Sequence, residues 1–295
     1  MLNEFIKKYN YKCWCQENAS RVVCYQLYLG KPFVVLQCEC CKTHRIIPHA
    51  AKNIDKIKNL YNTKKTSNCI SDVPQEQHND IAKTTIERLK RIGVEIDKNK
   101  KVLDVGCSDG FKINIIKSKY SCNVFGLDLN EQAIKIAKKK YPDIDFRTGF
   151  IENQEYKKNS FDIIIASAII EHVIDPVSFL KQLKDNLKPD GQIYILTPNS
   201  NSLLYFILGS LWRELLAIGE HVYLFDRLSI SKCADEAGLI VTNSFTDFDK
   251  TYLFFDIADL KATFISLFIK VIKKFTKLIS GKNNGDILHI KLIVK

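Results

Sequence analysis

Two acids flank a glycine-rich turn in the stretch KVLDVGCSDGFKINIIKSKYSCNVFGLDLN, residues 101–130. Asp104 lies in a short apolar run before the turn, and Asp128 ends a second apolar run some twenty residues later. The residues between the two runs have the apolar spacing of a helix. An acid at the carboxyl end of a parallel strand can hold a ribose hydroxyl. The stretch therefore predicts a strand, turn, helix and second strand that together bind an adenosine.

The residues of the turn narrow the choice of ligand. They form the pattern D-x-G-x-S-x-G, made by Asp104, Gly106, Ser108 and Gly110. Dinucleotide-binding turns instead have G-x-G-x-x-G, and phosphate loops have G-K-[ST]. A carboxylate beside the turn would repel a pyrophosphate but would attract a cation, such as the amino group or the sulfonium of S-adenosylmethionine. We therefore expect S-adenosylmethionine rather than a nucleotide phosphate.

A second pair of reactive residues ends a later apolar stretch, FDIIIASAIIEHVIDP, at residues 161–176. Glu171 and His172 lie where that strand should end, and reactive groups of open α/β sheets gather at such strand ends. A histidine titrates near neutral pH, so His172 could act as a general base. Glu171 could orient the histidine or help to hold a divalent metal. The alternative is that both residues only cap the next helix.

The first 50 residues contain six of the ten cysteines. Two close pairs separated by a strand-rich stretch are typical of a zinc ribbon, in which four thiolates bind one ion. The candidate ligands are Cys13, Cys15, Cys38 and Cys41. The first pair is C-x-C rather than C-x-x-C, and Cys24 and Cys40 are competing choices. The alternative is a ribbon that has lost its metal and keeps free, buried thiols.

Helical and strand patterns alternate after residue 79 and predict an α/β domain. The predicted organisation is a Cys-rich module at 1–48, a linker at 49–78 and a catalytic domain at 79–295. Within that domain an apolar insertion at about 200–222 suggests a lid over a pocket. A basic amphipathic helix is expected at about 256–280, with an apolar face over 262–279 that either packs or touches a membrane surface.

The motifs VLDVGCSDG, VFGLDLN and FDxIxxxxxxEHxxDP resemble those of the class I S-adenosylmethionine-dependent methyltransferases over about residues 81–294. The resemblance implies a Rossmann-like seven-stranded sheet whose last strand, at about 286–294, is antiparallel. It also implies a set of cofactor-binding residues: Asp104, Gly106, Cys107, Ser108, Gly110, Asp128, Leu129, Phe150, Ile151 and Ser167. Ser108 replaces the usual middle glycine, and Phe150 stands where the family usually places an aspartate for the adenine amino group.

The EH pair and the GEHVYLFDRL stretch that follows the insertion resemble the ubiquinone-type O-methyltransferases. This implies that His172, Glu171 and His221 are catalytic. The expected activity is methyl transfer to a hydroxyl of a sugar, a glycan precursor or a quinone-like compound. The alternatives are an RNA methyltransferase and a non-catalytic module that keeps the fold. Because related small-molecule and sugar-modifying methyltransferases carry zinc ribbons, the resemblance also favours zinc at the four cysteines.

Composition limits the size of the core, the expected cellular compartment and the class of binding partner. A chain of 295 residues with 46% hydrophobic residues can bury a full α/β core and still carry an appended module. The net charge of +11 favours anionic or lipid-linked acceptors and does not exclude membrane surfaces. We do not expect a nucleic acid, because aromatic residues do not interleave with the basic runs. No apolar run follows Met1, so we expect a cytoplasmic protein with reduced thiols, in peripheral contact with a membrane at most.

Overall fold

The computed structural model describes residues 2–9, 12–17, 19–28, 31–48, 75–209, 212–216, 221–248 and 284–295. The elements of the first half are α1 (Leu2–Tyr9), β1 (Ser20–Tyr28), β2 (Lys31–Cys38), β3 (His44–Ile47), α3 (Gln75–Ile92), β4 (Lys101–Val105), α4 (Phe111–Tyr120), β5 (Asn123–Asp128), α5 (Glu131–Lys140) and β6 (Asp145–Thr148). Those of the second half are η4 (Ile151–Asn153), β7 (Phe161–Ser167), η5 (Ile170–His172), α6 (Pro176–Asn186), β8 (Leu187–Pro198), α7 (Leu203–Leu208), α8 (Arg213–Leu216), β9 (Tyr223–Leu224), α9 (Arg227–Glu236), β10 (Leu239–Asp247) and β11 (Ile287–Val294).

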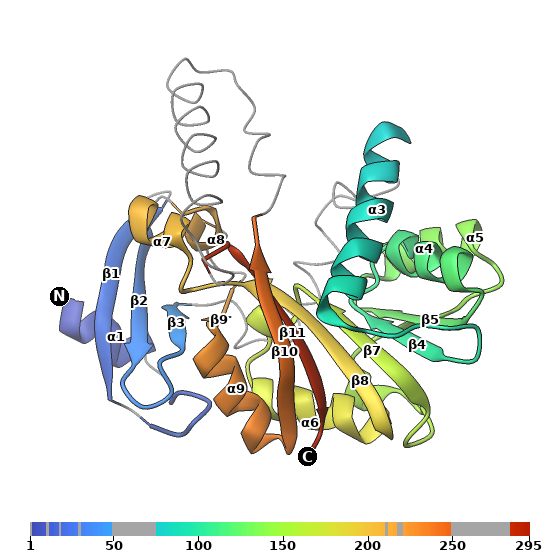
Figure 1. Ribbon diagram of the computed structural model, residues 1–295. Helices are drawn as coiled ribbons and strands as arrows, with labels where there is room; N and C mark the ends of the chain where they lie inside the picture. Colours follow the sequence, from blue (N-terminus) through green and yellow to red (C-terminus); the bar gives the residue numbers. More distant parts are fainter. Residues whose placement is uncertain are drawn as a thin grey trace.

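The main sheet has seven strands in the order β10-β11-β8-β7-β4-β5-β6 (Figure 1). Strands β4 to β8 pair in parallel, whereas β11 runs antiparallel to both β8 and β10. The order reverses at β4, and in open α/β sheets ligands bind at such a reversal, outside the carboxyl ends of the strands. The predicted Rossmann-like seven-stranded sheet with an antiparallel last strand is confirmed.

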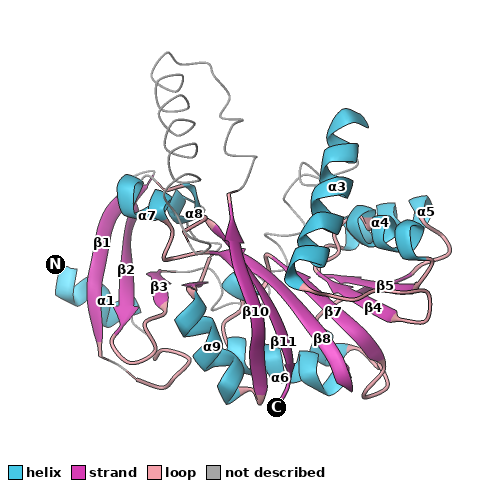
Figure 2. Ribbon diagram, viewed as in Figure 1, coloured by secondary structure: helices cyan, strands magenta, loops and turns pink. Residues whose placement is uncertain are grey.

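Helices cover both faces of this sheet (Figure 2). Successive strand residues point to opposite faces, so Val102 packs with α3, α4 and α5, while Leu103 packs with α6 and α9. The same alternation separates Ile163 and Ile165 from Ile164. Continuous apolar strands are therefore required here, because each strand is buried on both sides.

The N-terminal module forms a second, four-stranded sheet in the order β1-β2-β3-β9. Its first three strands are consecutive in the sequence, but β9 follows the predicted lid, about 175 residues after β3. Figure 1 shows β1, β2 and β3 beside β9 and α9, on the opposite side of the molecule from α4 and α5. The module thus joins the catalytic half through a strand that the catalytic half supplies.

Side-chain caps fix the starts of the helices that border the site. Asp175 accepts a hydrogen bond from the Ser178 N–H at the start of α6, and Pro176 occupies the first helical turn. Asp226 and Ser229 form a reciprocal capping box at the start of α9. Because Asp175 caps α6, the alternative in which Glu171 and His172 cap that helix is wrong.

Some sequence expectations fall outside the described residues. The basic amphipathic helix at about 256–280 lies there entirely, as does most of the linker at 49–78. The described part of the predicted lid contains α7 and α8. Among the helices that the structure describes, none is both long and apolar enough to cross a bilayer.

Candidate functional site

The glycine turn after β4 is held in a left-handed backbone conformation. Gly106, Ser108 and Gly110 have φ angles of 82°, 51° and 76°. A Cβ atom on Gly106 would lie 2.2 Å from the side chain of Ile169, and one on Gly110 would lie 2.5 Å from the ring of Phe146. Both glycines are therefore required, because a side chain at either position would strain the backbone and would clash with its neighbour.

Asp104 is buried at the end of β4, with only 4% of its surface exposed. Burial raises the pKa of its carboxyl group to about 7; the charge of Lys112 opposes this shift and that of Asp128 adds to it. A carboxyl group so poorly solvated gains stability in its ionised form from a nearby cation. Asp104 therefore fits the ammonium group of an amino-acid moiety.

Asp128 lies at the end of β5, facing the glycine turn. We call Asp104, the turn at residues 106–110 and Asp128 the cofactor cradle. One carboxylate oxygen accepts the Ser108 N–H at 2.8 Å, and the other accepts the Asn130 N–H at the same distance. Burial raises its pKa despite these hydrogen bonds. Since a carboxylate has about four acceptor positions, its oxygens can also accept a hydrogen bond from a ribose hydroxyl group. The donor set and the glycine cradle fit S-adenosylmethionine.

The other predicted cofactor residues lie along the same strand edge. The Gly149 N–H donates to the Asp128 carbonyl at 2.9 Å, which brings Phe150 beside the end of β5. Phe150 and Ser167 are half-buried, as is Leu129 next to Asp128, whereas Cys107 and Ile151 are buried. Burial raises the pKa of the Cys107 thiol, so this cysteine is a packing residue and not a nucleophile.

Glu171, His172 and His221 converge, although fifty residues separate the first pair from the third. Their ligating atoms lie within 4.8 Å of one another, and the two imidazole rings have centroids 4.8 Å apart. Glu171 is 1% exposed and accepts a hydrogen bond from the Thr197 hydroxyl at 3.0 Å. Burial raises the pKa of Glu171 to about 8. The three side chains could move a proton or hold a divalent cation.

The tautomer of His221 follows from its partner. Its Nδ1 lies 2.9 Å from the Glu214 carbonyl oxygen, and a carbonyl can only accept. In the neutral ring Nδ1 therefore carries the proton and Nε2 carries the lone pair, which is the arrangement that a general base needs. This carbonyl is a functional group that the sequence could not reveal, because any residue type supplies one.

The cluster of Glu171, His172 and His221 is connected to the cofactor cradle through Ile169. Ile169, whose side chain packs against Gly106, precedes Glu171 by two residues. Strands β4 and β7 are parallel neighbours, so Val105 and Ser167 end at the same edge of the sheet. The turn that carries Glu171 and His172 therefore follows a residue that packs against the glycine turn after β4.

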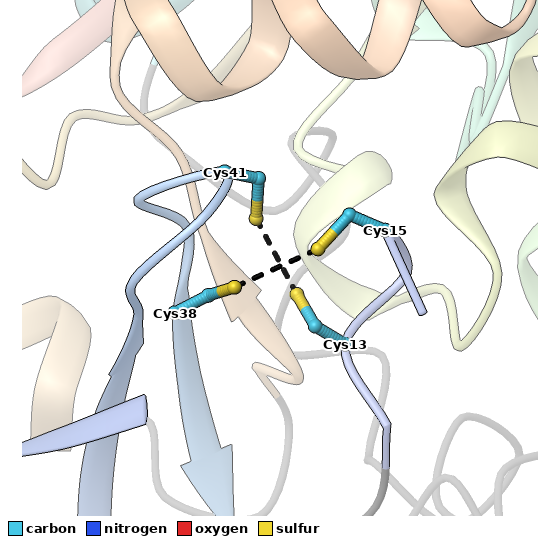
Figure 3. A group of neighbouring side chains, drawn as sticks. All are labelled: Cys13, Cys15, Cys38 and Cys41. Carbon is cyan, nitrogen blue, oxygen red and sulfur yellow. Dashed lines mark hydrogen bonds between the residues drawn. The ribbon is translucent and has the colours of Figure 1, made fainter. Parts of the chain in front are cut away.

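The four predicted cysteine ligands also converge (Figure 3). The sulfur of Cys13 lies 3.4 Å from that of Cys41, the sulfur of Cys15 lies 3.6 Å from that of Cys38, and all four are within 4.8 Å of one another. Zinc–thiolate bonds of about 2.3 Å in a tetrahedron place sulfurs about 3.8 Å apart. Cys24 and Cys40 are not part of this group. The spacing fits one zinc ion.

Local turns explain why these four sulfurs meet. Gln16 and Lys42 adopt positive φ angles of 63° and 67°, and each ends a tight turn that starts at Cys13 or at Cys38. The Trp14 indole N–H donates to the Thr43 hydroxyl at 2.9 Å and so joins the two turns. Because the sulfurs of Cys13 and Cys41 share one hydrogen bond, the pKa of Cys41 is lowered and that of Cys13 is raised.

Comparison with known sequences places this site in a family. The sequence profile of a methyltransferase-domain family matches residues 77–244, more than half of the chain. A ubiquinone biosynthesis O-methyltransferase of Coxiella burnetii is 35% identical over 162 residues, which is 52% of this chain and 69% of the relative. One of the same name from Actinobacillus pleuropneumoniae is 34% identical over 118 residues. That alignment covers 37% of this chain and spans only half of the relative.

Solved structures share the fold at low sequence identity. A geranyl diphosphate methyltransferase in complex with S-adenosylmethionine has a TM-score of 0.52 at 12% identity, covering 72% of this chain and 85% of the other. A phosphoethanolamine N-methyltransferase of Haemonchus contortus has a TM-score of 0.51 at 18% identity, covering 72% of this chain and 52% of the other. The family match and these shared architectures agree with the cradle described above. The chain belongs to the methyltransferase-domain family and is a class I S-adenosylmethionine-dependent methyltransferase.

Proposed function

We propose that this enzyme methylates a hydroxyl group of a small molecule, most simply a quinol-like or sugar-like acceptor. The observation that carries the proposal is the cluster of Glu171, His172 and His221 at the edge of the cofactor cradle. A hydroxyl is a weak nucleophile until it loses its proton, so a hydroxyl methyltransferase benefits from a base at this position. The names of the relatives, ubiquinone biosynthesis O-methyltransferases, support the same class of acceptor.

On the cofactor side, the residues of the cradle would bind S-adenosylmethionine and orient it. Asp104 would pair with the ammonium group, and Asp128, whose carboxylate is already fixed by the Ser108 N–H, would hold the ribose. Phe150 and Ile151 would border the adenine. The bound sulfonium supplies an activated methyl group, so in-line positioning of the acceptor provides much of the catalysis.

On the acceptor side, His221 is the stronger candidate for the base. Its Nδ1–H is held by the Glu214 carbonyl, so Nε2 can accept the hydroxyl proton. His172 lies beside it and is less buried, so it can relay the proton toward solvent. Glu171, with a pKa of about 8, is mostly protonated at neutral pH and can donate a hydrogen bond to either ring or to the acceptor.

The test is methyl transfer from radiolabelled S-adenosylmethionine to a panel of a catechol, a nucleotide sugar and an unmodified tRNA. We expect label in the catechol or the sugar. His221→Asn should lower kcat about 10²- to 10⁴-fold while leaving the S-adenosylmethionine dissociation constant unchanged, because it removes only the base. Label in tRNA alone would favour the RNA alternative, and full activity of both His221→Asn and His172→Asn would contradict the proposed base.

We also propose that Cys13, Cys15, Cys38 and Cys41 bind one structural zinc ion. The sulfur spacing and the two turns support it. Because all four positions of a tetrahedral ion would be filled by protein, the ion would stabilise structure and would not bind substrate. The test is zinc content by atomic emission: one ion per chain is expected in the wild type and in Cys40→Ser, whose cysteine is exposed and outside the group, but not in Cys41→Ser. Equal zinc in the two variants would rule out this site.

A further inference from the structure

The edge strand of the N-terminal sheet, β9, begins two residues after His221. It pairs with β3: His44 lies opposite Leu224, and Arg45 lies opposite Tyr223. The pairing extends one residue further, since the Ile46 N–H donates to the Val222 carbonyl at 3.1 Å. Val222 directly follows His221, so β3 fixes the backbone next to the proposed base.

Val222 is also hydrogen-bonded to Glu171. The Val222 N–H donates to the Glu171 carbonyl at 2.7 Å, while the Val222 side chain is fully buried. One residue therefore joins β3 on one side and the Glu171–His172 turn on the other. The chain after β9 is also tied down, because the Ser200 N–H donates to the Phe225 carbonyl at 2.8 Å.

The position of β3 depends in turn on the cysteine group. Cys38 ends β2 and Cys41 precedes β3 by three residues, so the second cysteine turn is the connection between the two strands. The Cys38 N–H donates to the Thr43 carbonyl, and the Thr43 hydroxyl accepts the Trp14 indole N–H from the first turn. An ion bound by both turns would fix the start of β3 from both sides.

We propose that the zinc-bound cysteine group positions the acceptor side of the active site, by holding β3 against β9 and thereby His221 against Glu171. The inference rests on the proposed zinc site and on the proposed role of His221. The cofactor cradle is built on β4, β5 and β6, none of which pairs with the N-terminal sheet. The acceptor side should therefore depend on zinc while S-adenosylmethionine binding does not.

The experiment is hydrogen–deuterium exchange on the full chain in four forms: zinc-loaded, stripped with a chelator, stripped and reloaded with zinc chloride, and Cys41→Ser. Cys40→Ser serves as the matched control. In zinc-free protein we expect the amides of Ile46 and Val222 to exchange at least about tenfold faster, because release of β3 opens the hydrogen bond from Ile46 to Val222 and, with it, the one from Val222 to Glu171. Amides of β4 and β5 should accelerate less than those of Ile46 and Val222, and the S-adenosylmethionine dissociation constant, measured by calorimetry, should change less than about twofold.

Reloading with zinc should restore slow exchange at Ile46 and Val222, which keeps the test valid even if Cys41→Ser folds poorly. Unchanged exchange of Val222 in protein shown to lack zinc would overturn the inference. Equal acceleration in β4 and β5 would also overturn it, because it would mean global unfolding rather than positioning. Failure of the wild type to bind zinc or S-adenosylmethionine is measured separately and would instead refute the zinc site or the cofactor assignment.

Discussion

At the scale of single residues, Asp104 is the residue that we propose to pair with the cationic group of the cofactor. Its carboxyl group sits at the end of β4 with almost no access to water, which raises its pKa to about 7. In the absence of cofactor the group is thus partly protonated at neutral pH. A cationic ligand favours the ionised form, so binding must release a proton whenever the group starts protonated.

We therefore predict that S-adenosylmethionine binds more weakly as the pH falls below 7. The dissociation constant should rise by up to about tenfold per pH unit between pH 7 and 5.5 and should level off above pH 7. Calorimetry in two buffers of different ionisation enthalpy measures both the affinity and the released proton. Asp104→Asn should bind weakly at every pH and should lose the slope. A wild-type affinity independent of pH would contradict an Asp104 contact with the ammonium group.

Ser108 is a second residue whose role can be tested, because it holds a left-handed conformation that favours glycine. Such a conformation costs a non-glycine residue about 1–2 kcal/mol, whereas glycine makes the unfolded chain more flexible by about 0.4–1 kcal/mol. Ser108→Gly should therefore raise the free energy of unfolding by about 0.5 kcal/mol, the difference between these two effects. Ser121, with a φ of 53° at the end of α4, is a matched control.

Urea unfolding of Ser108→Gly and Ser121→Gly measures this effect. Both variants should be slightly more stable than the wild type and should bind S-adenosylmethionine with unchanged affinity. If Ser108→Gly alone weakened binding, the hydroxyl would have to contact the cofactor, and the serine would be a functional replacement rather than a tolerated one.

Single residues also show how far sequence reasoning can reach. The shared location of Asp104 and Asp128 was predictable because they lie near the carboxyl ends of β4 and β5, and strand ends of a parallel sheet meet at one edge. Glu171 and His172 were expected at a strand end, but they lie in η5, after β7 ends at Ser167. The Glu214 carbonyl that orients His221 was not predictable, because backbone contacts leave no residue-type signal. The role of Phe150 stays a prediction, since its position at the β6 end permits contact with adenine but does not specify it.

At the scale of elements, a polar network joins α3 to three strands of the main sheet. Arg88 of α3 makes two hydrogen bonds to Asp247 of β10, at 2.9 and 3.2 Å. Asp247 lies 3.0 Å from Nε2 of His289 on β11, whose Nδ1 lies 2.7 Å from the Tyr194 hydroxyl on β8. Burial tends to raise the pKa of Asp247, but its bonds with His289 and Arg88 outweigh it and hold the pKa below the usual value.

We predict that Arg88→Ala lowers the free energy of unfolding by about 2 kcal/mol, because it leaves a largely buried carboxylate with one partner fewer. The control is Lys117→Ala, which removes an ion pair with the exposed Asp143 and should change the free energy of unfolding much less, because solvent screens an exposed pair. Urea unfolding measures both free energies, provided that the dependence of the free energy of unfolding on urea concentration is the same in the wild type and the variants. Equal losses in the two variants would show that the Arg88 pair is no more than a surface contact.

Elements that pair over a long distance in sequence were the least predictable. The seven strands of the main sheet follow from alternating helix and strand patterns, and all but the short β6 have an apolar run of their own. Strand β9 has two residues and pairs with β3 across almost 180 positions. Its pattern is too short to separate it from a loop, so the continuity between the N-terminal sheet and the catalytic half was not foreseen.

At the scale of the whole molecule, the Cys-rich module and the catalytic half share one hydrophobic core. Trp14, Cys38 and Cys41 belong to the same buried cluster as Leu180 of α6 and Tyr223 of β9. The predicted boundary at residue 48 therefore does not coincide with a break in packing. Two parts that share a core are expected to unfold together, whereas two separate domains would unfold in separate transitions.

We predict that Trp14→Ala lowers the stability of the entire chain and not of the module alone. Trp14 is 8% exposed, and truncation of a buried tryptophan costs about 3–5 kcal/mol through lost burial and the cavity left behind. Calorimetry should show a single transition that moves to lower temperature in Trp14→Ala and to higher temperature when S-adenosylmethionine is added, since the ligand binds only the folded state. Val22→Ala, at a position 45% exposed on β1, should leave the transition in place. A second transition that stays fixed in Trp14→Ala but shifts with S-adenosylmethionine would show that the catalytic half folds independently of the module.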